Sequence, residues 1–181
     1  ANAAITAGVT DAEIEVAAVS KVTGESALTG VYKAFEANGV QLDSKRTEVA
    51  QQELEVTNKI AQENANEKGF DSSKLDKAMI EIKKELAELK QKQGQLATKE
   101  DIERIINDAL KNNSLQNVIS KDQINALVAF AQNYQNTSAI DSKQVLEQLN
   151  SLSKSVSEKI NSLVEQAKNE GWLDKIAQFF Q

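Results

Sequence analysis

Carboxylates, hydroxyls and amines are the side chains left for acid–base or nucleophilic chemistry in this sequence, because it contains no histidine and no cysteine. A serine–histidine–aspartate triad and a cysteine–histidine pair are therefore excluded. Structural zinc sites built from cysteine and histidine are excluded as well. What stays open is chemistry by carboxylates alone, as in glycosidases, which hold two carboxylates across a cleft.

Several acidic residues in the N-terminal third could supply such a pair. Spacing cannot choose among them, because a chain with 27 acidic residues contains many coincidental pairs. The candidates are Glu25, Glu36, Asp43, Glu53 and Glu55. A further acidic set at residues 71–81 lacks the central glycine of a calcium-binding loop. We therefore expect no metal and no cofactor, and keep a carboxylate-dependent hydrolase of cell-envelope glycans as an alternative function.

The segment at residues 24–30, GESALTG, is the nearest approach to a phosphate-binding loop. It lacks the Lys-Ser/Thr pair that follows the second glycine of a P-loop. Leu28 stands where the serine-hydrolase motif needs its second glycine. We interpret the segment as a turn into a helix, with Gly30 allowing close packing. The alternative is a small anion held at that helix N-terminus.

The charge pattern argues against a nucleic-acid partner. The net charge is −6 with both signs interspersed, whereas a nucleic-acid-binding surface needs clustered lysines and arginines. The densest basic group is interleaved with acidic residues, so we interpret it as the solvated face of a helix. It comprises Lys83, Lys84, Lys90 and Lys92, with Glu81, Glu85 and Glu88 among them.

The composition predicts a mostly α fold. Proline is absent, and the abundant alanine, leucine, glutamate, lysine and glutamine favour helix. Narrow apolar stripes along the longer segments indicate helical hairpins or a bundle. The longest apolar run, residues 126–131, has six residues, far fewer than the ~20 that span a bilayer. We therefore expect no transmembrane segment.

The start of the chain has a different pattern. A short helix at residues 3–7 ends at Gly8, and residues 13–19 alternate as in a strand. A helix follows at residues 25–38, closed by Gly39. This helix–strand–helix start needs a partner for its strand. The partner is a weak strand at residues 115–119, another copy, or sequence outside this chain.

Further helices are expected along the rest of the chain. Thr98 followed by Asp101 resembles a capping box. We divide the chain into residues 1–68, a core segment, and residues 69–181, a helical extension. The expected helices run from Asp43 or Ser44 to about Asn66, from Ser72 or Ser73 to Gly94, from Thr98 through Leu110, from Ser120 to Asn133, and from Asp141 or Ser142 to Gly171.

Two apolar stripes are candidates for protein contacts. The first, which we name the heptad seam, repeats at intervals of four and three and is either a bundle seam or a self-association surface. It comprises Leu75, Met79, Ile82, Leu86 and Leu89. The last long helix carries the other stripe, made of Val145, Leu149, Leu152, Val156, Ile160, Leu163 and Ala167.

A final amphipathic segment carries an aromatic face. Its members fall on one side of a helix, with Asp174, Lys175 and Gln178 opposite. The aromatic face comprises Trp172, Leu173, Ile176, Phe179 and Phe180. It either folds back on the bundle or binds a membrane surface or a partner's groove.

Residues 2–36 read NAAITAGVTDAEIEVAAVSKVTGESALTGVYKAFE. They resemble the core segment of the YpuA-like secreted proteins of Gram-positive bacteria, a family of unknown function. The matching pieces are the NAxITAG helix, the acidic-apolar strand, and the TGxxALTG turn into a helix that ends KAFE. Residues 48–62, EVAQQELEVTNKIAQ, are similar to the family's next helix, and residues 120–134, SKDQINALVAFAQNY, to a later one.

The resemblance implies an exported protein, either extracellular or associated with the cell envelope. In the family pattern a signal peptide and another segment precede NAxITAG, so it also implies that this chain is a C-terminal portion. It carries no activity or functional residues over. We therefore expect a non-enzymatic, secreted helical binding or scaffold protein with a protein or cell-envelope partner. The alternatives are the glycan hydrolase and a self-assembling coiled-coil protein that forms homo-oligomers.

Overall fold

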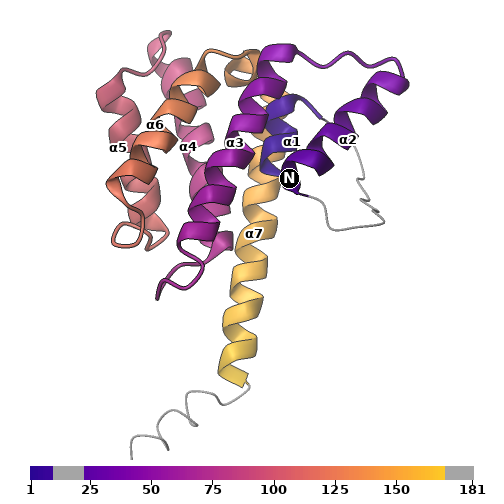
Figure 1. The fold of residues 1–181 in the computed structure, drawn as a ribbon. Helices are drawn as coiled ribbons and strands as arrows, with labels where there is room; N and C mark the ends of the chain where they lie inside the picture. Colours follow the sequence, from indigo (N-terminus) through magenta and orange to yellow (C-terminus); the bar gives the residue numbers. More distant parts are fainter. Residues whose placement is uncertain (10–22, 170–181) are drawn as a thin grey trace, which may run out of the picture.

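The computed structural model describes residues 1–9 and 23–169, and these residues form an almost entirely helical fold (Figure 1). The side chains of Leu163 and of residues 166–169 are also outside the description. The helices are α1 (Asn2–Ala7), α2 (Gly24–Ala37), α3 (Ser44–Glu63), α4 (Ser72–Gln93), α5 (Lys99–Asn112), α6 (Lys121–Gln135), the short 3-10 helix η1 (Ser138–Asp141) and α7 (Lys143–Asn169). The expected mostly α fold is confirmed.

The helix–strand–helix start is not supported, since these residues contain no strand. The candidate strand at residues 13–19 lies outside the described residues. The weak strand expected at residues 115–119 is wrong. Val118 and Ile119 both donate their N–H groups to the carbonyl of Leu115, at 3.0 Å each, which is the pattern of a tight turn. The side chains of Leu115 and Ile119 are buried in the core, which accounts for the apolar pattern of this segment.

Local side chains set most of the helix ends. Thr98 and Asp101 form the expected capping box of α5, and Gly94 ends α4 in the left-handed conformation, with φ of 71°. Asp43 caps α3 by accepting from the Arg46 N–H at 3.0 Å. Helix α4 begins at Ser72, as expected. Its cap is the preceding residue, Asp71, whose Oδ1 accepts from the Ser73 N–H at 2.7 Å.

The heptad seam lies in the core of the bundle. Helix α4 packs against α5, α6 and α7, and Leu75, Met79, Ile82 and Leu86 are at most 2% exposed. Leu89 is partly buried and packs against the same core. The seam therefore joins helices of one chain. Because the core includes Ile60 as well as Leu75, it crosses the boundary expected between residues 68 and 69.

Helix α1 is a short element held by distant parts of the sequence. It lies among α3, α4 and α7, and Ala3 and Ala7 are buried in a second apolar cluster with Leu28 of α2. A helix of six residues is too short to be stable alone. Its conformation therefore depends on the surface that receives it.

Helix α7 extends beyond the other helices (Figure 1). It has 27 residues and α3 has 20, which correspond to about 40 Å and about 30 Å. Val145 and Leu149 are buried in the core, and Leu152 and Val156 pack against it. Of the helices in residues 1–9 and 23–169, none combines the length and apolar character needed to cross a bilayer.

Gly30 does not have the close packing expected of it. It lies inside α2, and a Cβ built there would meet no atom within 4 Å. We expect Gly30→Ala to raise the free energy of unfolding by about 0.5–1 kcal/mol, because alanine loses less backbone entropy in a helix. Gly39→Ala is the control, since its surroundings are equally open but its φ is 78°. It should destabilise by about 1 kcal/mol, and chemical denaturation measures both.

Candidate functional site

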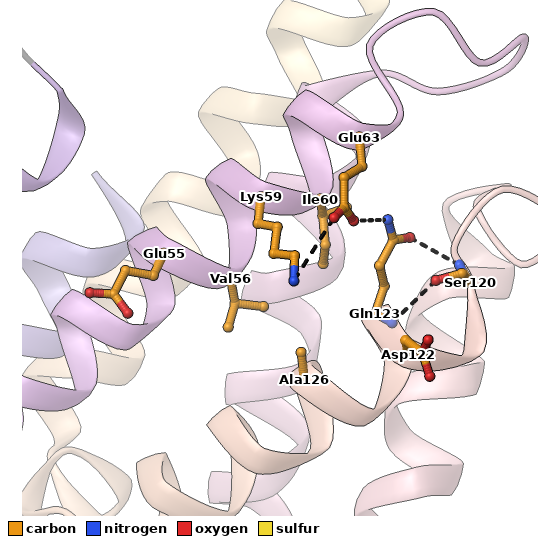
Figure 2. A pocket seen from close by; sticks show the side chains of 9 residues that line it. All are labelled: Glu55, Val56, Lys59, Ile60, Glu63, Ser120, Asp122, Gln123 and Ala126. Atoms are coloured by element: carbon orange, nitrogen blue, oxygen red, sulfur yellow. Dashed lines mark hydrogen bonds and ion pairs between the residues drawn. The ribbon is translucent and has the colours of Figure 1, made fainter.

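A groove between α3 and α6 hollows the described surface (Figure 2). The C-terminal half of α3 faces the N-terminal half of α6, so the two helices run antiparallel. The groove has a volume of about 430 Å³ and is lined by Glu55, Val56, Lys59, Ile60, Glu63, Ser120, Asp122, Gln123 and Ala126. We call it the α3/α6 groove.

One end of the α3/α6 groove is closed by polar contacts that begin with the capping box of α6. The Gln123 side chain accepts from the Ser120 N–H at 2.9 Å and donates to Glu63 Oε2 at 2.8 Å. Lys59 lies 3.9 Å from the other oxygen of Glu63. The carboxylate of Glu63 also faces the N-terminus of α6, where the helix dipole favours negative charge. These polar groups are therefore engaged with one another.

The floor of the groove is apolar and its rim is charged. Ile60 is 1% exposed, and Val56 and Ala126 are half-buried between the two helices. Glu55 and Asp122 are exposed at the rim. An apolar floor with a mostly acidic rim suits the docking of an amphipathic segment.

A second hollow continues along the same two helices. It has a volume of about 370 Å³ and is lined by Lys45, Glu48, Val49, Gln52, Asn133 and Asn136. The Asn133 amide donates to Gln52 Oε1 at 2.8 Å and joins the helices there. Over both hollows the lining carries four carboxylates and two lysines, so the α3/α6 face is acidic.

The two groove carboxylates of α3 are poorly placed as a pair for two-carboxylate hydrolysis. Glu55 and Glu63 are eight positions apart on α3, which separates them by about 12 Å along the helix axis. Retaining and inverting glycosidases place their carboxyl groups roughly 5 to 9.5 Å apart across the scissile bond. Glu63 is moreover held by Gln123 and Lys59.

The other candidate carboxylates have separate roles. Glu25 accepts from Asn58 at 2.8 Å, and its pKa is lowered by a backbone hydrogen bond and then by Asn58. Asp43 caps α3, and Glu36 is exposed on α2. Glu53 is 1% exposed and belongs to the ion pair described next.

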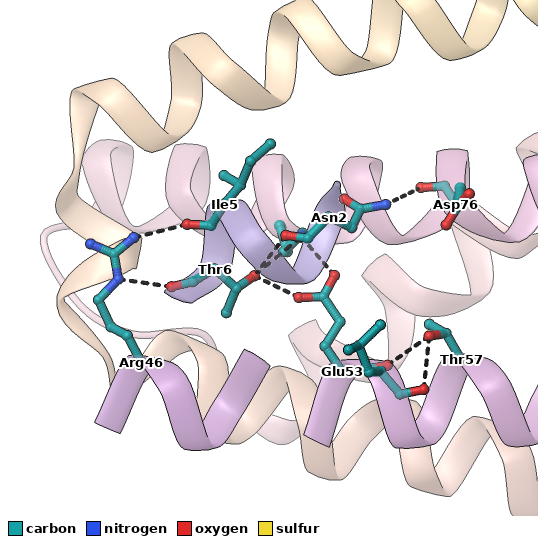
Figure 3. A network of polar contacts seen from close by, with 9 residues as sticks. Asn2, Ile5, Thr6, Arg46, Glu53, Thr57 and Asp76 are labelled. Carbon is teal, nitrogen blue, oxygen red and sulfur yellow. Dashed lines mark hydrogen bonds and ion pairs between the residues drawn. The ribbon is translucent and has the colours of Figure 1, made fainter. Parts of the chain in front are cut away.

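A buried ion pair joins α3 and α4 beneath α1 (Figure 3). Lys83 Nζ lies 2.7 Å from Glu53 Oε1, and the two side chains are 0% and 1% exposed. Helix α1 completes the site, because Thr6 donates its hydroxyl to Glu53. Lys83 also donates to the Asn2 carbonyl and to Thr6 Oγ1, at 3.3 Å each. A buried charge pair needs such further hydrogen bonds to offset its desolvation.

The burial of Lys83 corrects the sequence interpretation that placed it on a solvated face. The sequence pattern groups Lys83 with Lys84, Lys90 and Lys92, but α4 packs against α5, α6 and α7 and buries Lys83. A signal was present, since Ile80 and Ala87 lie three positions before and four after Lys83 on the same face. Both are buried.

Arg46 holds the C-terminal end of α1. Its guanidinium donates from Nε to the Thr6 carbonyl at 2.8 Å and from Nη2 to the Ile5 carbonyl at 2.9 Å. The last carbonyls of a helix lack partners within it, so a fork of two donors is well matched to them. No sequence motif indicates this contact, because it joins residues 40 and 41 positions apart.

Burial dominates the electrostatics around α1. Desolvation lowers the pKa of Lys83, and the neighbouring carboxylate of Glu53 opposes that shift. Desolvation raises the pKa of Asp76, which lies beside Asn2, and raises the pKa of Tyr134, which is 0% exposed. Lys83 and Glu53 are thus closed to solvent, and their charges stabilise the position of α1 rather than face a ligand.

The aromatic face of Trp172, Leu173, Ile176, Phe179 and Phe180 lies outside the described residues and stays a prediction. Within residues 1–9 and 23–169, no group of three or more acidic side chains is arranged to hold a metal ion. Among the described surfaces, the α3/α6 groove and the end of α7 after Val156, which we call the free end of α7, are the candidates for contact with a partner.

Comparison with known proteins places the chain in a family. The family described as "Protein of unknown function (DUF1002)" matches residues 1–152. The "Uncharacterized protein YpuA" of Bacillus subtilis (strain 168) is 33% identical over 181 residues, which cover 99% of this chain and 56% of that protein. The chain therefore spans about half the length of this relative. No solved structure matches. Both matches together show that the chain belongs to the DUF1002 family, which includes YpuA-like proteins.

Proposed function

We propose that this chain is a non-enzymatic helical binding protein that works outside the cell or at the envelope of a Gram-positive bacterium. Its binding surface is the α3/α6 groove. The observation that carries the proposal is the apolar floor of Val56, Ile60 and Ala126 below an open, mostly acidic rim. The place of action rests on the resemblance to YpuA-like secreted proteins.

The carboxylates support binding over catalysis. Glu53 is neutralised by Lys83 in the core, Glu63 is bonded to Gln123, and Asp43 serves as a helix cap. A glycosidase needs one carboxyl group of raised pKa facing a second carboxylate across a cleft. The exposed Glu55 has its nearest groove carboxylate on α3 about two helical turns away.

Incubation with purified Gram-positive cell wall, followed by product analysis, tests the proposal against the glycan hydrolase. We expect no soluble sugar to be released, and no difference from a Glu55→Gln variant. Sugar release that this variant abolishes would overturn the proposal and establish the hydrolase. Binding is measured separately by isothermal titration calorimetry with candidate envelope proteins.

A further inference from the structure

We propose that the chain self-associates head to tail, with the free end of α7 from one copy lying in the α3/α6 groove of the next. This rests on the proposed binding role of the groove and names its occupant as a second copy of this chain. Two surfaces of the described residues carry it: the end of α7 after Val156, which extends past the core formed by the other described helices, and the groove itself (Figures 1 and 2).

The free end of α7 continues a face that is already used for helix packing. Val145, Leu149 and Leu152 follow the spacing four and three, and they pack in or against the core. Val156 is the last residue of this stripe in contact with the core. Ile160 and Val164 follow at intervals of four and so stay on the same face. Ile160 is half-buried and Val164 is 47% exposed.

The groove matches this end of α7 in length and polarity. Its α3 side runs from Glu55 to Glu63, about 12 Å or two turns of helix. From Val156, α7 continues to Asn169, which is about 20 Å. The apolar floor of Val56, Ile60 and Ala126 can therefore cover Ile160 and Val164. The end of α7 would then pack on α3 and α6 as a third helix packs on two neighbouring helices.

The charges favour this pairing. The groove exposes Glu55 and Asp122 at its rim, with Glu63 shared between Lys59 and Gln123. On α7, Lys159 borders the apolar stripe, about 100° from Ile160 around the helix. Glu158 and Glu165 lie about 160° and 140° from Ile160, on the opposite face. Helix α7 thus presents a lysine to the acidic rim and turns its own carboxylates away.

A symmetric pairing of two α7 ends is less well matched. It would offer Lys159 no carboxylate from the partner helix, because Glu158 and Glu165 face away from the stripe. The head-to-tail contact joins two different surfaces, so a pair of chains still has one free groove and one free α7 end. Further copies can therefore add, and the assembly grows into rings or open chains. Because the contact is only a few helical turns long, we expect weak, concentration-dependent association.

Sedimentation velocity of the full chain from micromolar to millimolar concentration tests the proposal. We expect the average mass to rise with concentration. Ile160→Glu, beyond the core, should weaken association by about tenfold or more by placing a charge in the contact. The double variant Glu55→Lys/Asp122→Lys should do the same by reversing the rim. Glu36→Lys on α2 is a control for charge reversal away from the groove and should associate as the wild type does.

Mixing the two variants decides the geometry. Each retains one intact surface, namely the groove in Ile160→Glu and the α7 end in the double variant. We therefore expect the mixture to form one-to-one dimers that neither variant forms alone. Circular dichroism of each variant verifies its fold.

Other results overturn the proposal. A chain that stays monomeric throughout excludes self-association. Loss of association in Ile160→Glu alone, without complementation, indicates symmetric pairing of α7. Association that neither variant changes indicates another surface. In each case the binding function of the groove is unaffected, whereas sugar release from cell wall would overturn that function whatever the mass.

Discussion

Replacing Lys83 with methionine should lower the free energy of unfolding by about 3–5 kcal/mol, although methionine has a similar shape and is more apolar. The loss arises because Glu53, the partner of Lys83, stays buried without its counter-ion. Glu53 is 1% exposed, and without Lys83 its carboxylate would keep only the Thr6 hydroxyl as a side-chain donor among the described residues. An unpaired buried charge costs far more than a neutral group of the same size.

The double variant Glu53→Leu/Lys83→Met should lose less than Lys83→Met alone, because it removes both charges and leaves an apolar pair. Thr6 retains an acceptor there, since its hydroxyl can donate instead to the Asn2 carbonyl, which lies 3.4 Å away. Lys84→Met is the matched control. Lys84 is the next residue on α4 and is half-buried, so its replacement should change stability by about 0.5 kcal/mol or less.

Urea denaturation of all these variants gives the required free energies. If Lys83→Met were no more harmful than Lys84→Met, Lys83 would not be paired in the core. If the double variant lost as much as the sum of Lys83→Met and Glu53→Leu measured singly, the two side chains would not interact.

The helices and several of their ends could be predicted from the sequence because local residues determine them. Gly94 ends α4 by adopting a positive φ, and the capping box of Thr98 and Asp101 lies within four consecutive residues. The absence of proline removed the strongest helix breaker. The heptad seam was also predictable as a spacing, because α4 packs its face of Leu75, Met79, Ile82 and Leu86 against neighbouring helices.

The candidate sites could not be predicted in the same way because they depend on which helices become neighbours. Lys83 reads as a surface lysine until α3 brings Glu53 to it across 30 positions. The groove needs Val56 and Ala126 from two helices that are far apart in the sequence. The apolar stripe of α7 can be recognised in the sequence. Its division after Val156 into a packed part and a free part cannot, because it depends on where the shorter helices end.

Replacing Arg46 with alanine should release α1 and lower the free energy of unfolding by about 2–3 kcal/mol. The change removes two charge-assisted hydrogen bonds, which are stronger than neutral ones. It leaves the Thr6 carbonyl at the end of α1 without the donor that lies 2.8 Å away in the wild type. Arg46→Lys keeps the charge but not the planar fork, so its loss should be smaller.

Hydrogen exchange locates the effect. Because α1 has six residues, its protection depends on docking, and we expect its amides to exchange faster in Arg46→Ala while those of α5 change less. Arg104→Ala is the matched control, since Arg104 is 53% exposed and its ion pairs, at 3.6 and 3.8 Å, lie on the surface of α5. Such pairs contribute about 0–1 kcal/mol. Equal effects of the two alanine variants would mean that the Arg46 fork does not hold α1. A larger effect confined to α1 would establish that this short helix is seated by recognition of its carbonyls, as a bound peptide would be.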